Sequence, residues 1–294
     1  MSLRTSAGIA QVHHPSRAFD LSRAALYKAA SPEERPKVRS ERRRPEPTSI
    51  TDERLLTEIR TIATEHAAWG HRKVWAMLRW RAICVARRRV WKLMHEAQLT
   101  FSPDARRCEP RGGTVIVPKP NRRWSTDMTT VWSRKDGWVA VTPVIDNGCR
   151  TVFEIGVTKA QDAPAILRPL EDALHATFGE PGTVPGDFEL RSDHGSVYTG
   201  ADCEQLCDEW RVTHTFSPVG RPTGNAVAER VIQTMKLELF WLQDWEDADE
   251  IGAAAEKWRI FYNTQRPHEA LNWRTPAEQR ALLLGEQPAL RRAA

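Results

Sequence analysis

Trp124-Ser125-Thr126-Asp127-Met128-Thr129 opens a run with the composition of a β-strand, and it holds an acidic side chain. Two more acids stand out downstream: Asp193, where a short apolar segment meets a turn, and Glu229, early in a long helical pattern. Between the first pair lie 65 residues, and between the second pair 35. Lys236 follows Glu229 by seven positions, which is about two helical turns, so the pattern predicts that both project from one helix face.

Three carboxylates that converge would hold two divalent cations about 4 Å apart, an arrangement that clamps the attacking and leaving oxygens of a phosphoryl displacement. Mg²⁺ prefers few carboxylates and keeps waters that a substrate phosphate can displace, and we expect Mn²⁺ to substitute for it. Lys236 would then lie against nucleic-acid phosphate. Each acid taken alone, among 38 in the chain, is more simply read as a solvated surface charge. The hypothesis therefore depends on the three as a set.

The sequence blocks around the three acids resemble those of a known protein family. The blocks are Trp-Ser-Thr-Asp-Met-Thr, Ser-Asp-His-Gly-Ser-Val-Tyr-Thr, and Gly-Asn-Ala-Val-Ala-Glu-Arg with Lys236 downstream. They resemble the catalytic blocks of bacterial insertion-sequence transposases of the OrfB type, whose DDE core is similar to retroviral integrase. The resemblance implies an α/β, ribonuclease-H-like integrase core with a five-stranded mixed sheet and flanking helices. It places Asp127 on the first strand, Asp193 at the end of the fourth, and implies that both, with Glu229, are catalytic metal ligands.

The function expected from this resemblance is a DNA transposase, a two-metal polynucleotidyl transferase that binds the ends of an insertion sequence and performs strand cleavage and strand transfer. The resemblance further implies double-stranded DNA as partner, a circular intermediate, homo-oligomeric assembly on DNA ends, and an OrfA partner joined by frameshifting. Two alternatives stay open: a non-catalytic DNA-binding regulator or decayed transposase, and a ribonuclease-H-like nuclease. Joining of a supplied 3′-hydroxyl end to target DNA would separate transferase from nuclease.

Charge and composition limit which cell compartment and which kind of binding partner can be expected. Residues 1–120 hold 24 Lys and Arg against 12 Asp and Glu, whereas residues 121–294 hold 19 against 26, so a basic first part is expected to bind a polyanion. No apolar run approaches 18 residues, which argues against a membrane span, and the N-terminus lacks a secretory signal. Five cysteines without a Cys-x-x-Cys pair fit a reducing bacterial cytoplasm.

Composition shifts divide the chain into five expected parts. They are an N-terminal arm with a short helix over Leu21–Ala29 and a basic linker (1–50), a helix-turn-helix domain (51–101), a linker (102–120), the catalytic core (121–245), and a helical tail packed on the core (246–294). The tail carries Tyr262-Asn263 and Arg266-Pro267-His268, which match the tail of the same family. The sequence supports no chemical role for them.

Residues 51–101 read as three short helices, the last of them basic, which is typical of a DNA-binding helix-turn-helix module. Thr51 or Asp52 caps the first, and the third turns Val90, Trp91, Leu93 and Met94 inward. The sequence Trp69-Gly70-His71-Arg72-Lys73-Val74 resembles the helix-turn-helix segment that precedes the core of OrfB transposases. A helical bundle with a solvated basic face is the alternative. The candidate DNA contacts here are Arg72, Lys73, Arg87, Arg88, Arg89 and Lys92.

Inside the core the pattern predicts a first strand over Trp124–Trp132, then strands and helices in alternation, with Asn225 as cap of the helix that carries Glu229. Asp146 is interpreted as a turn residue or secondary contact. Cys203 and Cys207, one turn apart on a helix, are interpreted as two half-buried thiols rather than metal ligands. His194 would orient water, touch phosphate or face outward.

Overall fold

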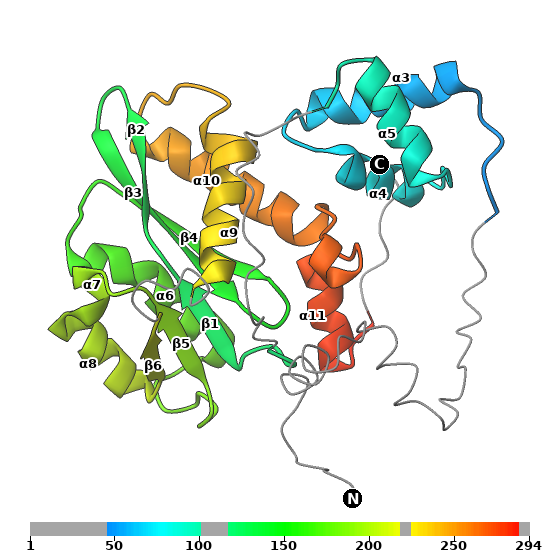
Figure 1. Ribbon diagram of the computed structural model, residues 1–294. Helices are drawn as coiled ribbons and strands as arrows, with labels where there is room; N and C mark the ends of the chain where they lie inside the picture. The colour runs from blue at the N-terminus through cyan, green and yellow to red at the C-terminus, as the bar shows by residue number, and fades with distance from the viewer. Residues whose placement is uncertain (1–45, 101–116, 218–224, 288–294) are drawn as a thin grey trace, which may run out of the picture. The chain divides into compact units, whose positions relative to one another are not determined.

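The computed structural model describes residues 46–100, 117–217 and 225–287 (Figure 1). The short helix expected over Leu21–Ala29 and nearly all of the two expected linkers lie outside these ranges. Contacts between Cα atoms group the chain from Pro47 onward into one compact unit. None of the helices described there combines the length and apolar character needed to cross a membrane.

Three helices form a small module: α3 Asp52–Glu65, α4 His71–Trp80 and α5 Arg87–Glu96. Thr51 caps α3, as expected, by accepting a hydrogen bond from the amide of Arg54. The buried apolar side chains of the module make a cluster of their own: Leu55, Ile59, Ile62, Trp69, Val74, Leu78, Val90, Leu93 and Met94. The inward position expected for Trp91 is wrong. Its side chain is 44% exposed and stacks on His95, because Val90, Leu93 and Met94 already occupy the inner face of α5.

The second part of the chain is built on one mixed sheet. Its strands in the described residues are β1 Arg123–Thr126, β2 Thr129–Ser133, β3 Gly137–Asp146, β4 Val152–Thr158, β5 Glu189–Ser192 and β6 Thr213–Phe216. Strand β3 lies antiparallel to β1, β2 and β4, whereas β5 runs parallel to β1 and β6 parallel to β5. A hairpin meander thus continues into parallel strands joined by helices, as α/β layering requires.

The sheet has six strands, not the five expected, because the first expected strand is interrupted. Strands β1 and β2 pair with β3 in one continuous register, so they are two pieces of a single line. The gap between them is Asp127-Met128, where the amide of Met128 donates to Oδ1 of Asp127 at 2.8 Å. A side chain that bonds the neighbouring backbone competes with the ladder in this way. The interruption leaves Asp127 outside the sheet ladder.

Helices cover both faces of the sheet (Figure 1). On one face lie α6 Ala163–Phe178, α7 Ser196–Thr199 and α8 Ala201–Trp210, and on the other lie α9 Ala226–Met235 and α10 Ala248–Thr264. Side chains of strand β3 alternate between the two faces of the sheet. Val144 packs in the core under α6 and α8, whereas Val141 and Ile145 pack in the core under α9 and α10. Gly156 of β4 allows α6 to approach, since a Cβ there would overlap the ring of Pro169.

Four elements of the described chain follow α9: η2, a π-helix over Lys236–Phe240, then α10, the 3-10 turn η3 Glu269–Leu271, and α11 Pro276–Leu284. Asn263 on α10 bonds both backbone groups of Val152, accepting from its N–H at 3.0 Å and donating to its C=O at 2.7 Å. Thr275 and Glu278 form a reciprocal capping box at the start of α11. The tail motif therefore supplies specific polar contacts to the edge of β4.

Candidate active site

Asp127 and Asp193 each stand one residue beyond the end of a β-strand. Strands β1 and β5 are hydrogen-bonded neighbours and run parallel, with Ser125 opposite Arg191 (Figure 1). The carboxyl ends of parallel neighbours meet at one edge of a sheet, where ligands of α/β proteins commonly bind. The topology therefore brings these two aspartates side by side although 65 residues separate them.

Glu229 lies in the first turn of α9 and is exposed. Asn225 precedes that helix, as expected, but its side chain makes no cap bond. Its Nδ2 donates instead to the carbonyl oxygen of Thr126 at 2.9 Å. This bond joins the start of α9 to the last residue of β1, immediately before Asp127, and so holds the helix that carries Glu229 at the edge where the two aspartates meet.

The electrostatics of Asp127 indicate that the other two acids lie near it. The pKa of Asp127 is raised to about 6, first because the carboxyl is partly buried, and further by the negative charges of Asp193 and Glu229. The amide of Met128 and the ammonium group of Lys236 act in the opposite direction. Because such interactions fade with distance, three acids and a lysine far apart in the chain are neighbours in the fold.

The donor set fits hard divalent cations. Among the described residues the three acids do not bring one oxygen each within 4.8 Å of one another, so their spacing is wider than that of ligands to a single ion. Carboxylate oxygens that repel one another are also the ligands that Mg²⁺ and Mn²⁺ prefer. The donor chemistry of the three acids therefore fits the divalent metals expected from the sequence.

Lys236 marks the point where the helix carrying Glu229 changes from α to π geometry, since α9 ends at Met235 and η2 begins at Lys236. Lys236 also lines a groove of about 490 Å³. Three strongly exposed tryptophans share that lining, Trp132 at 55%, Trp138 at 57% and Trp241 at 67% exposed. Lys236, whose charge acts on Asp127, and three exposed aromatic faces thus line one groove.

Comparison with known proteins agrees with this geometry. Two models described as an integrase core domain match residues 117–222 and 197–276, and a model described as an HTH-like domain matches residues 51–107. The transposase for insertion sequence element IS629 of Shigella sonnei is 29% identical over 240 residues, 77% of this chain and 79% of that protein. The transposase InsD for insertion element IS2 of Escherichia coli is 26% identical over 250 residues, 80% of each.

The chain belongs to the insertion-sequence transposases that carry an integrase core. A chain of the simian T-cell lymphotropic virus intasome aligns with this transposase at a TM-score of 0.48 and 16% identity, over 80% of the transposase and 76% of that chain. The membership confirms the expected α/β integrase core, preceded by helix-turn-helix-like helices.

Two other residues that the sequence suggested near the acidic site, Asp146 and His194, have contacts within the protein. Asp146 is fully buried and accepts hydrogen bonds from the amides of Asn121 and Gly148 at 2.7 Å each, and from Nη1 of Arg280 at 3.2 Å. It closes the turn after β3. His194 is exposed and stacks on Phe216, with ring centroids 5.0 Å apart.

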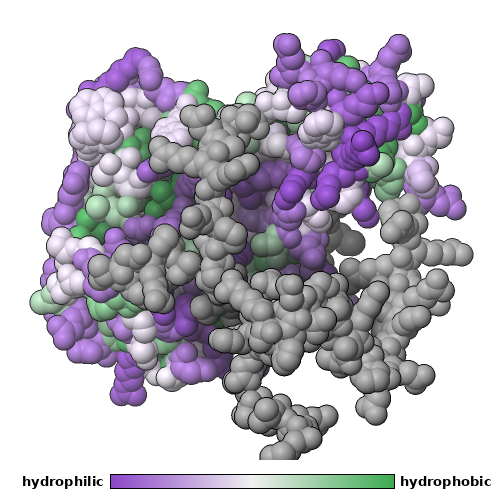
Figure 2. Space-filling model, in the orientation of Figure 1, coloured by the Kyte–Doolittle hydropathy of each residue, from purple (hydrophilic) through white to green (hydrophobic). Residues whose placement is uncertain are grey.

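The basic residues of the helical module divide into exposed and engaged ones. Figure 2 shows a largely hydrophilic surface over α3 to α5. Arg87 and Arg88, at the start of α5, are exposed, as is Lys92, which makes only a long contact of 3.7 Å with Glu96. In contrast, Arg89 donates to Asp52 and to the carbonyl of Ile50, both at 2.7 Å. Arg89 therefore holds α5 against the start of α3.

Arg72 and Lys73 of α4 are engaged with acids of the second part of the chain. Arg72 pairs with exposed Glu269 at 3.1 Å. Lys73 lies 2.6 Å from Oε1 of Glu238, whose side chain is only 8% exposed. The Lys73 ammonium is therefore occupied within the protein, and its pKa is lowered to about 8, by burial first and then by the charge of Arg266.

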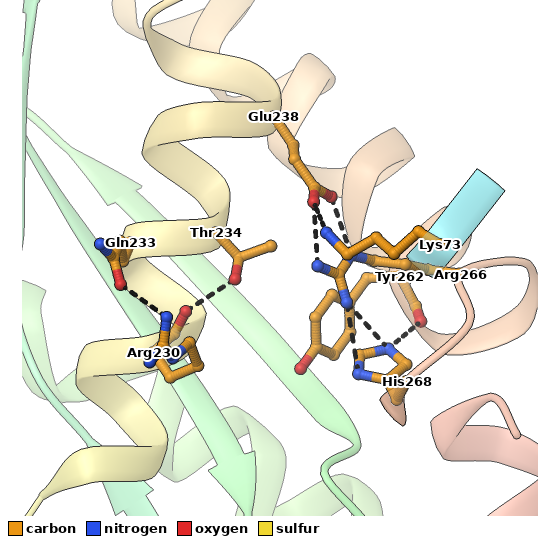
Figure 3. Close-up of polar contacts among 8 residues, drawn as sticks. All are labelled: Lys73, Arg230, Gln233, Thr234, Glu238, Tyr262, Arg266 and His268. Carbon is orange, nitrogen blue, oxygen red and sulfur yellow. Dashed lines mark hydrogen bonds and ion pairs between the residues drawn. The ribbon is translucent and has the colours of Figure 1, made fainter. Parts of the chain in front are cut away.

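Glu238 is the centre of a buried polar network that sequence analysis did not identify (Figure 3). Arg266 donates to both of its oxygens, Nε to Oε2 at 2.8 Å and Nη2 to Oε1 at 2.9 Å, while Lys73 approaches from α4. The same guanidinium lies over the ring of Tyr262 and contacts His268 at 3.3 Å. Burial would raise the pKa of Glu238, but Arg266 and then Lys73 lower it to about 2. The tail motif thus anchors the π-helix that begins at Lys236.

Proposed function

We propose that this polynucleotidyl transferase cleaves and joins DNA strands at Asp127, Asp193 and Glu229, which hold two Mg²⁺ ions. The observation that carries the proposal is the meeting of three acids, two after parallel strands and one on α9, at Asp127. Lys236, whose charge acts on the same carboxyl, is the candidate contact to DNA phosphate. Residues 51–101 are proposed as the domain that recognises DNA and residues 121–245 as the catalytic core.

In this mechanism each residue has a limited task. When bound, the ions supply activation of a water or a 3′-hydroxyl and stabilise the leaving oxygen. Asp127, whose carboxyl is affected by the charges of both other acids, is proposed as the shared ligand, with Asp193 and Glu229 as ligands to one ion each. Asn225 holds α9 against β1 through Thr126 and so positions Glu229 relative to the aspartates. Lys236 and the tryptophan-lined groove offer a cation and stacking faces to the DNA strand that enters.

The test is an assay with purified protein, DNA carrying the element's terminal repeats, and Mg²⁺ or Mn²⁺. The proposal expects cleavage at the repeat ends and joining of the 3′-hydroxyl to target DNA. Specific binding without cleavage would favour a DNA-binding regulator, and cleavage without joining would favour a nuclease. Either outcome would contradict the proposed transferase.

The finer partners of the transposase are also proposals. Joining two element ends to one target requires more than one copy of the site, so we propose a homo-oligomer assembled on DNA. An OrfA partner, or a fusion with it, and residence with the bacterial nucleoid in the cytoplasm follow from the family resemblance. Size-exclusion chromatography with and without paired repeat-end DNA would test the assembly directly.

Arg87→Ala and Arg88→Ala are each expected to weaken DNA binding by α5 and to reduce the slope of log K against log salt by about 1, because one phosphate contact is lost. Binding titrations at several salt concentrations measure both effects. Arg89→Ala is the matched control: it sits on the same helix turn but is bonded to Asp52. Its expected effect is on stability rather than on the salt slope. An unchanged slope in both exposed variants would contradict the proposed contacts.

Asp127→Asn is expected to stabilise the metal-free protein above pH 7. The folded protein holds the proton of Asp127 up to about pH 6, whereas the unfolded chain releases it near 3.8, so stability falls as pH rises through this interval. Removing the charge should recover about 1–2 kcal/mol of unfolding free energy. Urea unfolding at pH 8 with a chelator measures the gain, and the same comparison at pH 4 should show little difference. A loss of stability at pH 8 would contradict the shared acidic site.

A further inference from the structure

A second cluster of metal-ligating side chains lies away from the acidic site. Cys203 and Cys207 lie on α8 and His214 on β6, and their two sulfurs and a ring nitrogen all fall within 4.8 Å of one another. Within the described ranges of the chain, these are the residues of type His, Cys, Asp or Glu that meet so closely in a set of three. Cys203 is 0% and Cys207 5% exposed. The two half-buried thiols expected from the sequence are in fact buried, and His214 of the next strand, which that expectation did not include, lies beside them.

Local structure explains why the three meet. Cys203 and Cys207 are four residues apart and so lie on one face of α8. The helix ends at Arg211 in a left-handed conformation, and the amide of Val212 donates to the carbonyl of Cys207 at 2.8 Å. This tight return brings the following strand, β6, back against the helix. The turn therefore places His214 beside the two sulfurs.

Hydrogen bonding determines which nitrogen of His214 faces the thiols as an acceptor. The hydroxyl of Ser192 donates to the carbonyl of Asp193 at 2.9 Å, which uses its single hydrogen. Its contact of 2.9 Å with Nε2 of His214 is then a bond donated by Nε2–H. In a neutral imidazole the lone pair consequently resides on Nδ1, which lies 3.9 Å from Sγ of Cys203. The histidine is arranged as a metal ligand whose other nitrogen is already held.

The chemistry of the cluster suits one borderline-soft divalent ion. Two thiolates and a neutral imidazole would balance the charge of Zn²⁺, which a buried site requires. Tetrahedral zinc with Zn–S bonds of about 2.3 Å separates two sulfur ligands by roughly 3.8 Å, within the observed clustering of the three ligand atoms.

We propose that Cys203, Cys207 and His214 bind one Zn²⁺ ion that joins α8 to β6, separately from the Mg²⁺ pair of the acidic triad. Its consequence for the reaction is positional. His214 holds Ser192, and Ser192 holds the backbone of Asp193, so an ion on Nδ1 would stiffen the strand end that presents this acid. Zinc binding itself does not depend on the proposed catalytic roles.

Cobalt titration of the full-length protein tests the site, with millimolar Mg²⁺ present to occupy the carboxylates. Thiolate ligands give Co²⁺ an intense near-ultraviolet charge-transfer band that carboxylates do not. We expect this band to saturate at one equivalent and to be displaced by Zn²⁺. Cys203→Ser and Cys207→Ser should each weaken the binding at least about 100-fold, more than the loss of an outer-shell partner. Cys84→Ser, a cysteine of the helical module, is the matched control and should leave the band unchanged.

A measurement on the unaltered protein guards against variants that fail to fold. In urea below the unfolding transition, where local opening lets buried thiols react, one equivalent of Zn²⁺ should slow the alkylation of two thiols, and peptide mapping should locate them at Cys203 and Cys207. No stoichiometric cobalt band, a band that survives both serine variants, or protection mapped to other cysteines would each overturn the proposal. Loss of the band with Cys84→Ser would overturn it as well.

Discussion

Glu229→Gln is expected to lower DNA end joining by at least about 10³-fold, an effect at the upper end of those seen when one charge-stabilising group is removed from an active site. Glutamine keeps the shape of the side chain and its position on α9 but removes the negative charge that acts on Asp127. DNA binding by the helical module should persist, because α5 is a separate element. Joining of labelled repeat ends and a binding titration, run on the same preparations, measure both quantities.

Glu204→Gln is the matched control for this prediction, since it is an exposed glutamate near the start of another helix, α8. It should join DNA at the parental rate. Asp127→Asn and Asp193→Asn are expected to match the loss seen with Glu229→Gln. Joining that persists in Glu229→Gln with Mg²⁺ would show that the acid on α9 does not belong to the site.

Glu238→Ala is expected to reduce the free energy of unfolding by about 3–5 kcal/mol, the usual cost of removing one partner from a buried ion pair. The change leaves Arg266, which is 7% exposed at its side chain, and Lys73 without their shared carboxylate. Denaturant unfolding followed by circular dichroism measures the loss. Combining Glu238→Ala with Arg266→Leu should recover part of it, because the uncompensated charge is then removed.

Glu269→Ala provides the comparison, since Glu269 also pairs with a residue of α4 but does so at the surface. Its expected cost is below about 1 kcal/mol. The contribution of Glu238 should also depend on pH. Its folded pKa of about 2 lies below the ordinary value of 4.5, so the stabilisation is complete above about pH 4.5 and is lost as pH falls toward 2. Equal effects of the two substitutions at pH 7 would contradict a buried network.

Local patterns in the chain were sufficient for most elements of the core. Strand composition predicted the strands β1 and β5, although Asp127 and Asp193 lie one residue beyond their ends, and the helical pattern predicted the helix that carries Glu229. Burial of one helix face or one strand face is imposed on neighbouring residues, so it can be recognised over a short span. The break between strands β1 and β2 at Asp127 was not predictable from the sequence. The amide of Met128 bonds to the Asp127 side chain instead of continuing the strand, and this depends on pairing with strand β3, which lies further along the chain.

The roles of the basic residues show where pattern reasoning reached its limit. Arg87 and Arg89 are equivalent in a charge count, yet one is exposed and the other is bonded to Asp52. Lys73, a candidate DNA contact from the sequence block that resembles the family, is paired with Glu238, 165 positions away. Whether a charged side chain contacts solvent, DNA or another residue depends on which groups the fold places next to it, and these are known only from the complete structure.

The chain's amino acids alone established the α/β class, the three acids and their family pattern, because spacing and local periodicity are properties of the polymer before it folds. Only the folded arrangement revealed that Asn225 ties α9 to β1, that Arg266 and Lys73 share one buried carboxylate, and that His214 joins two cysteines. Each of these depends on contacts between residues of different elements. Packing of the sheet and its helices decides such contacts, since it places side chains within bonding distance whatever their separation along the chain.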